Sequence, residues 1–255
     1  MTPITVTGRT RSLVIVLDRF ANWVARHWLG MFIVIYGAYV LTPFLAPILM
    51  QAGATGPANG IYSAYSLVCH QLPERSIFLF GDKPMYSFDE VKSVWPEDGF
   101  LGLRKFVGNP DFGYKIAWSD RMMSFYGSIW IGAILFALLR KRMRPLPPPS
   151  WFFLGILPVG IDGVTHMIND ALAGTTGLGF RDTNAWLQFI TGNILPPWFY
   201  VGDAFGSFNS DLRWITGFLF GLTTVWFIFP IIEAGMRDVQ MNAARQLQRA
   251  AERTR

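Results

Sequence analysis

Four segments of this chain contain almost no charged side chains. Each is close to the ~20 residues that a helix needs to cross a bilayer. They run over residues 28–50, 122–139, 151–169 and 214–232. The exception is Asp162 in the third segment. Three of the four segments begin with tryptophan, whose amphipathic ring prefers the headgroup level. The sequence therefore predicts an all-α, polytopic transmembrane helical bundle of about four spans.

Composition supports a chain that contacts the lipid bilayer. Hydrophobic residues make up 51% of it and charged residues only 15%, whereas soluble domains carry about 25% charged residues. The net charge of +5 would also suit a nucleic-acid-binding protein. The basic residues, however, form short clusters beside apolar runs, which is typical of membrane flanks. We therefore expect no nucleic-acid partner.

The basic clusters predict how the chain is oriented. Residues 140–144 carry four positive charges, and arginines are frequent both before residue 27 and after residue 236. The segment 168–212 holds a single basic residue, Arg181. Because basic loops stay in the cytoplasm, both termini and the 140–144 loop are expected there. This predicts a multi-pass protein of a bacterial cytoplasmic (inner) membrane with an even number of spans.

Outside the spans, the sequence predicts three further parts. Apolar residues of 13–27 follow a helical spacing, so residues 1–27 are expected to form a cytoplasmic helix on the membrane surface, before a membrane domain over 28–235. Residues 81–118 are predicted to form a polar outer cap, in which Ser87 and Glu90 have the spacing of a capping box. The stretch 236–255 is expected to be a basic cytoplasmic tail that continues the fourth helix.

Two weaker apolar stretches are interpreted as interfacial helices. They cover residues 61–80 and 185–205. If only one of them crossed the membrane, the basic 140–144 loop would lie outside the cytoplasm. The second stretch also contains Pro196-Pro197 and two glycines, which disfavour a continuous helix. Whether either stretch is re-entrant or spanning stays open from the sequence alone.

The candidate chemistry of the membrane region centres on Asp162 and His166. They are four residues apart and so share one face of the third span. A carboxylate at mid-membrane costs at least ~2.5–3.5 kcal/mol, so Asp162 should face the bundle and have a partner. One interpretation is a metal-ligand pair or a proton-handling site. The other is a hydrogen-bonded aspartate that locks helices together.

The Cys69-His70-Gln71 sequence precedes Arg75 on the same outer side, where His70 and His166 would approach each other. Neutral imidazoles with the Asp162 carboxylate suit a divalent metal ion, and two imidazoles could ligate haem. His70, Asp162 and His166 are therefore the candidate metal ligands. The alternative is a polar cluster with Cys69, Gln71 and Arg75, without any cofactor.

Two smaller patterns concern packing rather than chemistry. Residues 120–121 (Asp-Arg) open the second span and residues 181–182 (Arg-Asp) open an outer helix, which predicts helix caps and ion pairs at the membrane edge. Gly217 and Gly221 have the spacing that lets two membrane helices pack closely.

Several motifs in a fixed order resemble a known family. They are Cys69-His70-Gln71-x-Pro73-x-Arg75-Ser76, Pro158-x-x-x-Asp162-Gly163-x-Thr165, and Arg181-x-Thr183-Asn184 followed by Thr-Gly-x-x-x-Gly. Together they resemble an uncharacterised bacterial and archaeal family of small polytopic membrane proteins marked by a Cys-His-Gln motif. The resemblance implies a fold and a topology, and it implies no activity.

Three functions fit these observations. The favoured function is that of a non-catalytic subunit or assembly factor of a larger membrane complex. A bioenergetic complex is one candidate. Other membrane protein subunits are therefore expected as partners. A metal- or haem-binding membrane enzyme with a site near the outer leaflet is the second. The third is a small oligomeric transporter in which Asp162 is the coupling acid. No phosphate-binding loop, HExxH sequence or nucleophile elbow is present, so whether the chain is an enzyme stays open.

Overall fold

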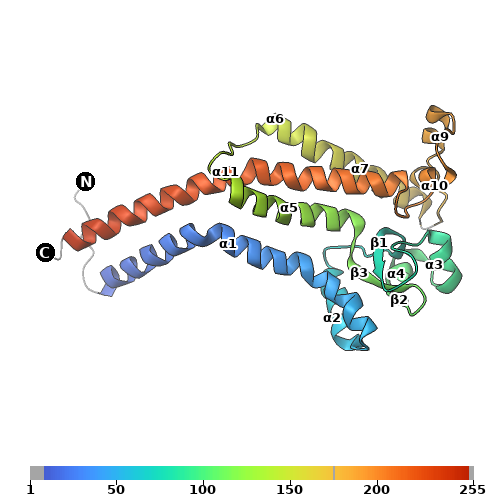
Figure 1. The fold of residues 1–255 in the computed structure, drawn as a ribbon, viewed down its shortest axis with the longest axis horizontal. Coiled ribbons are helices and arrows are strands. Elements are labelled where there is room, and N and C mark those ends of the chain that lie inside the picture. Colours follow the sequence, from blue (N-terminus) through green and yellow to red (C-terminus); the bar gives the residue numbers. More distant parts are fainter. Residues whose placement is uncertain (1–8, 175, 253–255) are drawn as a thin grey trace.

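A computed structural model describes residues 9–174 and 176–252 of the chain. Its described part contains four helices that are long and apolar enough to cross a membrane, in agreement with the four predicted spans. They lie along one another, with smaller elements gathered at one end (Figure 1). The four are α1 (Arg9–Gln51), α5 (Asp120–Leu139), α6 and α7 (Pro148–Trp151 and Leu157–Ala173, joined by a π-helical turn at Phe152–Ile156), and α11 (Phe208–Glu252).

The separate surface helix predicted before the first span is not a separate element. Helix α1 runs without a break from Arg9 to Gln51, so residues 9–27 are its first part. No proline and no glycine occurs between Arg9 and Trp28, and nothing else in that stretch ends a helix. Residues 1–8, which the prediction also included, lie outside the described part.

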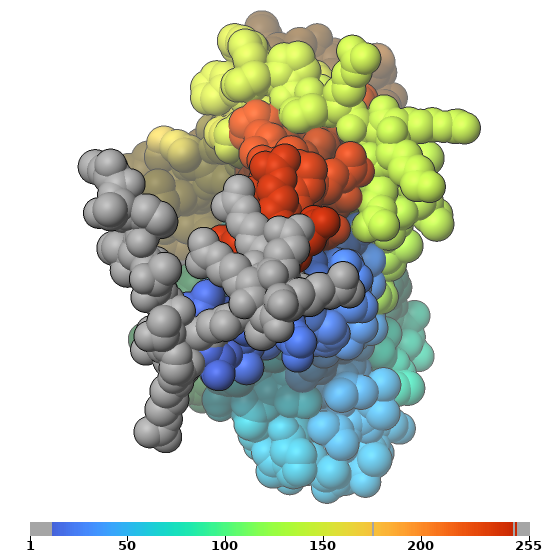
Figure 2. Space-filling model, turned by 90° about the vertical axis from the view of Figure 1, so that its left-hand side faces the viewer, coloured from blue at the N-terminus to red at the C-terminus, as the bar shows by residue number. Residues whose placement is uncertain are grey.

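Helix α11 continues well past the fourth span, as the helix-prone tail predicts. Its 45 residues correspond to about 68 Å at 1.5 Å per residue, about twice the thickness of a hydrocarbon core. This extension lies beside the first part of α1 (Figure 2). There Gln240 Nε2 donates to Ala25 O at 2.8 Å, and Trp28 Nε1 donates to a Glu233 carboxylate oxygen at 3.0 Å. The start of α1 and the end of α11 therefore share one end of the molecule, as an even number of spans requires.

The opposite end carries residues 55–119, called the cap below, which contain the stretch 81–118 predicted as a polar cap and a small sheet that the sequence did not reveal. Its strands β1 (Ser76–Leu79), β3 (Gly113–Ser119) and β2 (Gly108–Asn109) are antiparallel in the order β1-β3-β2. The strands β1 and β2 are too short to give a clear alternating pattern in the sequence, and β3 gives none because six of its seven residues are buried. Strand β3 leads directly into α5, so the sheet fixes where the second span begins.

Short helices complete the cap. They are α2 (Thr55–Tyr65), α3 (Phe88–Val94) and α4 (Gly99–Arg104), with a 3₁₀ turn at Pro73–Arg75. The capping box is confirmed, because Ser87 Oγ accepts from Glu90 N while the Glu90 carboxylate accepts from Ser87 N at 2.8 Å.

The stretch 185–205 folds into two short helices that follow α8 (Phe180–Thr183). They are α9 (Ala185–Thr191) and α10 (Pro197–Tyr200), and neither is long enough to cross a membrane. The stretch 61–80 is not one helix: it holds the end of α2, a loop, the 3₁₀ turn and β1, and α2 with its 11 residues is also too short to cross a membrane. Their placement at a membrane interface remains a prediction.

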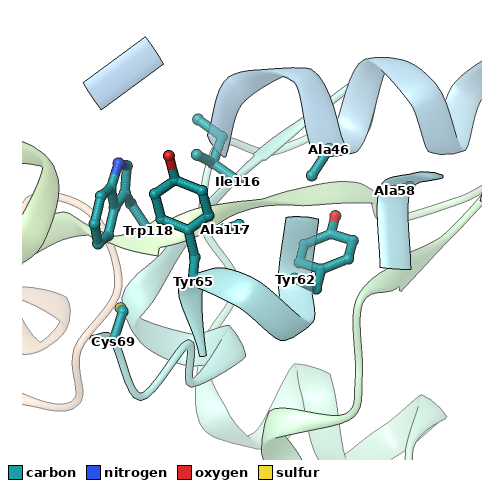
Figure 3. Close-up of a cluster of buried hydrophobic side chains, with 8 residues drawn as sticks. All are labelled: Ala46, Ala58, Tyr62, Tyr65, Cys69, Ile116, Ala117 and Trp118. Atoms are coloured by element: carbon teal, nitrogen blue, oxygen red, sulfur yellow. The ribbon is translucent and has the colours of Figure 1, made fainter. Parts of the chain in front are cut away.

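A buried cluster anchors the cap on α1. Figure 3 shows its eight side chains, which come from α1, from α2 and the loop after it, and from β3. The rings of Tyr65 and Trp118 meet edge to face at 4.9 Å between centroids. Tyr65 Oη donates to Tyr39 O at 2.7 Å, and Trp118 Nε1 donates to Val40 O at 3.3 Å. Both bonds end on backbone carbonyls of the first span, so the cap and α1 form one unit.

Helices α5 and α11 approach each other most closely along a seam of serines and glycines. Ser124 Oγ donates to Arg213 O at 3.2 Å, and Ser128 Oγ donates to Gly217 O at 3.3 Å. A Cβ atom at Gly221 would overlap Ser128 Oγ and lie 2.8 Å from Phe125 O. The glycine spacing noted in the sequence therefore serves this contact.

Replacing Gly221 by alanine should destabilise the protein. The added methyl group forces the two helices apart, and overpacking of this kind costs about 1–3 kcal/mol. Thermal unfolding in detergent measures the effect. Gly235→Ala is the matched control in the same helix, because nothing lies within 4 Å of a Cβ there. Equal midpoints for the two variants would contradict the packing seam.

Candidate functional site

A network of buried charges occupies the end of the bundle next to the cap. It joins four arginines to four aspartates from five parts of the chain. They come from the 3₁₀ turn before β1 (Arg75), the start of α5 (Asp120, Arg121), α7 (Asp162, Asp170), α8 (Arg181), and the segment from the α10–α11 loop into α11 (Asp203, Arg213). The formal charges of these eight groups cancel, which lets them be buried together.

One branch of the network is a continuous chain of ion pairs. Arg213 Nε donates to both Asp120 oxygens at 2.9 and 2.8 Å, and Arg213 Nη1 donates to Asp203 Oδ1 at 2.6 Å. Asp203 Oδ2 accepts from Arg75 Nε at 2.8 Å. Arg75 then binds Asp170 through both terminal nitrogens, at 2.8 and 2.9 Å. Such two-point pairs fix orientation as well as distance.

Asp203 is the shared acceptor of this branch. It is buried, and burial by itself raises the pKa of a carboxyl group. The adjacent guanidinium groups of Arg75 and Arg213 outweigh burial and hold the pKa of Asp203 well below its usual value. Asp203 is therefore ionised at neutral pH, and it keeps both arginines in place.

The second branch is built on Asp162. Arg121 Nη2 donates to Asp162 Oδ2 and Arg181 Nη2 donates to Asp162 Oδ1, both at 2.8 Å. The expectation that Asp162 faces the bundle and has a partner is confirmed. His166 connects the branches, with Nδ1 3.2 Å from Asp162 Oδ1 and Nε2 3.8 Å from Asp203 Oδ1.

The predicted metal ligands are only partly brought together. Asp162 and His166 are neighbours, as their spacing predicts. His70 makes other contacts, because its Nδ1 accepts from Leu72 N at 3.0 Å and its ring packs near Phe100. Within the described residues, no group of three or more His, Cys, Asp and Glu side chains is arranged to hold a metal ion. The metal and haem hypotheses thus remain predictions, without a preformed set of ligands in that part of the chain.

Of the alternative polar cluster, only Arg75 joins the network. Gln71 Nε2 donates to Tyr62 O at 2.9 Å, and the Cys69 sulfur accepts from Ser119 N at 3.3 Å. Gln71 has a φ of 54°, a left-handed conformation that turns the chain between α2 and the 3₁₀ turn. These two side chains therefore hold the loop that presents Arg75.

Sequence reasoning missed most of the network. No motif of the sequence points to Asp203 or Arg213, and for Asp120 and Arg121 the sequence predicts only helix capping and ion pairs at the membrane edge. The signal that would have found them is charge balance across elements. Each predicted span after the first has charged residues within it or next to it, toward the end that lies away from the 140–144 loop. Some of these residues are acidic and others are basic, so they could pair with one another.

Beside the network lies a cavity of about 600 Å³ between the cap and the end of α7. Glu74, which also lines it, is buried next to Arg75, and its Oε2 has no hydrogen-bond partner. Burial raises the pKa of Glu74 from 4.5 to about 7, although Arg75 opposes the shift. Lys115, whose charge also acts on Glu74, donates from Nζ to Gln71 O at 2.7 Å and to Arg104 O at 2.8 Å. Burial lowers the pKa of Lys115 to about 7.

Comparison with known proteins supports a membrane protein. Residues 112–196 match a family described as "Predicted membrane protein" (DUF2085). The chain is also 26% identical over 199 residues to an uncharacterised protein of the archaeon Methanocaldococcus jannaschii, covering 76% of this chain and 85% of that protein. No solved structure matches the chain. The resemblance to an uncharacterised membrane family is thereby supported, while the Cys-His-Gln motif lies outside the matched family region.

Removing the shared acceptor should destabilise the fold strongly. Asp203→Ala leaves Arg75 and Arg213 buried with too little negative charge, and breaking a buried pair in this way costs about 3–5 kcal/mol. Denaturant titration in mixed micelles measures the loss. Lys83→Ala is the control, because its pair with Glu90 is exposed and such pairs contribute about 1 kcal/mol or less. Similar losses in both variants would contradict the central role of Asp203.

The carboxyl group of Glu74 should make stability depend on pH. Its pKa is higher in the folded than in the unfolded chain, so its contribution is fully present below about pH 4.5 and is lost as the pH rises to about 7. Lys115 acts in the opposite sense, losing its contribution as the pH falls from about 10.5 to about 7. The charged neighbours Arg75 and Asp203 also face Glu74.

Glu74→Gln isolates the carboxyl contribution, because it leaves Lys115 in place. The thermal midpoint of this variant, relative to that of the natural protein, should rise between pH 5 and pH 8. Unfolding scans over that range test it. A difference between the two proteins that stays constant with pH would contradict the buried, titrating carboxyl group.

Proposed function

We propose that this protein is a non-catalytic subunit or assembly factor of a larger membrane complex. The observation that carries the proposal is an apolar surface outside the four candidate spans. Between Leu178 and Phe205, large apolar side chains are exposed although they belong to none of these helices. They are Leu178, Phe180, Trp186, Phe189, Ile190, Ile194, Leu195, Trp198, Val201 and Phe205.

Exposed apolar patches of this kind mark interaction surfaces. The side chain of Phe189 is 88% exposed, and Ile190 beside it is exposed as well. The backbone of this segment is nevertheless held firmly, since Asn184 Nδ2 donates to Tyr200 O at 2.7 Å and Gly202 N donates to Asp182 O at 2.7 Å. A fixed backbone that presents apolar side chains suits a partner protein, because little ordering is needed on binding.

The pairing within the network also favours a structural role. Asp162 accepts from two arginines, and His166 lies between Asp162 and Asp203. A metal-dependent enzyme or a proton-coupled transporter would have to release Asp162 from those arginines before using it. No observation favours either of these alternatives over the subunit.

We infer further that the protein lies in a bacterial cytoplasmic membrane with both termini in the cytoplasm. The four positive charges of residues 140–144, together with the basic end of α11, support this orientation. The cap and the cavity then face outward.

Affinity purification from native membranes in a mild detergent tests the subunit role. We expect other membrane proteins to copurify in a fixed ratio, and Phe189→Ser should reduce their recovery severalfold, because the serine removes apolar contact area. Leu67→Ser is the matched control, since Leu67 is 87% exposed and also lies outside the four helices. Purification as a stable monomer without partners would contradict the proposal, as would equal recovery with both variants.

A further inference from the structure

The cavity between the cap and the membrane helices has the size of a ligand site. Its volume of about 600 Å³ falls in the range of small-molecule pockets, about 300–1,000 Å³. The described residues that line it come from the Glu74–Arg75 turn, α3 and the start of α4, the end of α7, α8 and the loop before α11. It therefore lies where the cap meets the end of α7 and the segment that leads to α11.

Negative charge predominates in the lining. Five acidic side chains line the cavity, Glu74, Asp89, Asp170, Asp182 and Asp203, against one basic side chain, Arg75. Arg75 is already occupied, because its three guanidinium nitrogens bind Asp170 and Asp203. Asp89 and Asp182 consequently have no free cation within the lining, and Glu74 has Arg75 nearby but makes no ion pair with it.

Glu74 is the side chain that most requires a ligand. It is only 6% exposed, and its Oε2 is buried without a hydrogen-bond partner. A buried carboxylate oxygen that lacks a partner is costly, and an added donor would remove that cost. By contrast, Asp182 accepts from Gly179 N at 2.9 Å, so its carboxylate serves to cap α8.

Aromatic rings complete the lining. Phe88 and Phe100, from α3 and α4, both border the cavity. The faces of such rings attract cations as well as apolar groups. An occupant with a positive end and an apolar body would satisfy Glu74 and these rings together.

We propose that the cavity binds a small organic molecule with a primary ammonium group. The ammonium N–H groups donate to the Glu74 carboxylate, and the apolar part of the molecule packs against Phe88 and Phe100. A bare metal ion fits less well, since no group of three or more metal-binding side chains is formed among the described residues. The cavity and the apolar surface of residues 178–205 share Leu178 and Val201. Phe189, at which the subunit role is tested, does not line the cavity, so the two proposals can fail separately.

Binding of benzylamine to the purified, detergent-solubilised protein tests the proposal. Benzylamine is a primary ammonium ion at neutral pH and carries an apolar ring, and benzyl alcohol has a similar shape without the charge. Isothermal titration calorimetry at pH 7.5 should show saturable binding of benzylamine to one site, and at least tenfold weaker binding of benzyl alcohol. Equal binding of the two probes, or no saturable binding of benzylamine, would overturn the proposal.

Variants locate the site. Glu74→Gln should weaken benzylamine binding by about tenfold or more, the effect of losing a hydrogen bond to a charged group. Asp111→Asn, an exposed acid outside the cavity, should leave the affinity unchanged. Asp89→Asn, at an exposed acid of α3 that also lines the cavity, provides a second test if Glu74→Gln does not fold, with an expected severalfold loss. If Glu74→Gln folds and binds benzylamine with unchanged affinity, the assignment is overturned. If only Asp89→Asn folds, unchanged affinity in that variant overturns it.

The pH dependence separates the Glu74 contact from general attraction of a cation. In the natural protein, benzylamine affinity should increase from pH 6 to pH 8 as Glu74 loses its proton. In Glu74→Gln this increase should largely disappear. The same increase in both proteins would contradict a direct contact with Glu74.

Discussion

Charge balance in a region of low dielectric is the constraint on which this structure depends. A single aspartate or arginine at this depth would cost several kcal/mol, and the cost falls only when an opposite charge lies within hydrogen-bond distance. Asp203 and Arg213 meet this requirement for each other and for Arg75 and Asp120 on two other segments, and Arg75 extends it to Asp170 on α7. The ends of α5, α7 and α11 must therefore lie at one level, and the cap must close over them.

The sequence predicts the spans well and their connections poorly, for physical reasons. Uncharged runs of about 20 residues have few interpretations, so the four helices could be placed from hydropathy alone. The capping box at Ser87 and Glu90 is also local and was found. The pairs of Arg75 with Asp170 and with Asp203 span 95 and 128 residues, and no local pattern encodes them. Likewise, β1 and β3 are short strands separated by 33 residues, and their pairing depends on the tertiary fold.

The spacing of Asp162 and His166 shows where sequence reasoning reaches its limit. An acid and an imidazole four residues apart suit a metal ion and an ion-pair network equally, because both need the two side chains on one helix face. What differs is the third group that approaches them. Here it is Arg121 on α5, with Arg181 on the other side. Only the packing of α5 and α8 against α7 reveals that these groups are guanidinium ions.

The order of the chain adds a consequence for biosynthesis. Arg213, which pairs with Asp120 and Asp203, belongs to α11, which leaves the ribosome after α5 and α7. Until α11 has entered the membrane, Asp120 at the start of α5 lacks the guanidinium group that it binds in the finished fold. An incomplete chain therefore carries an unmatched charge near the lipid. Truncation before α11 would leave Asp120 without the guanidinium group that balances its charge in the folded protein.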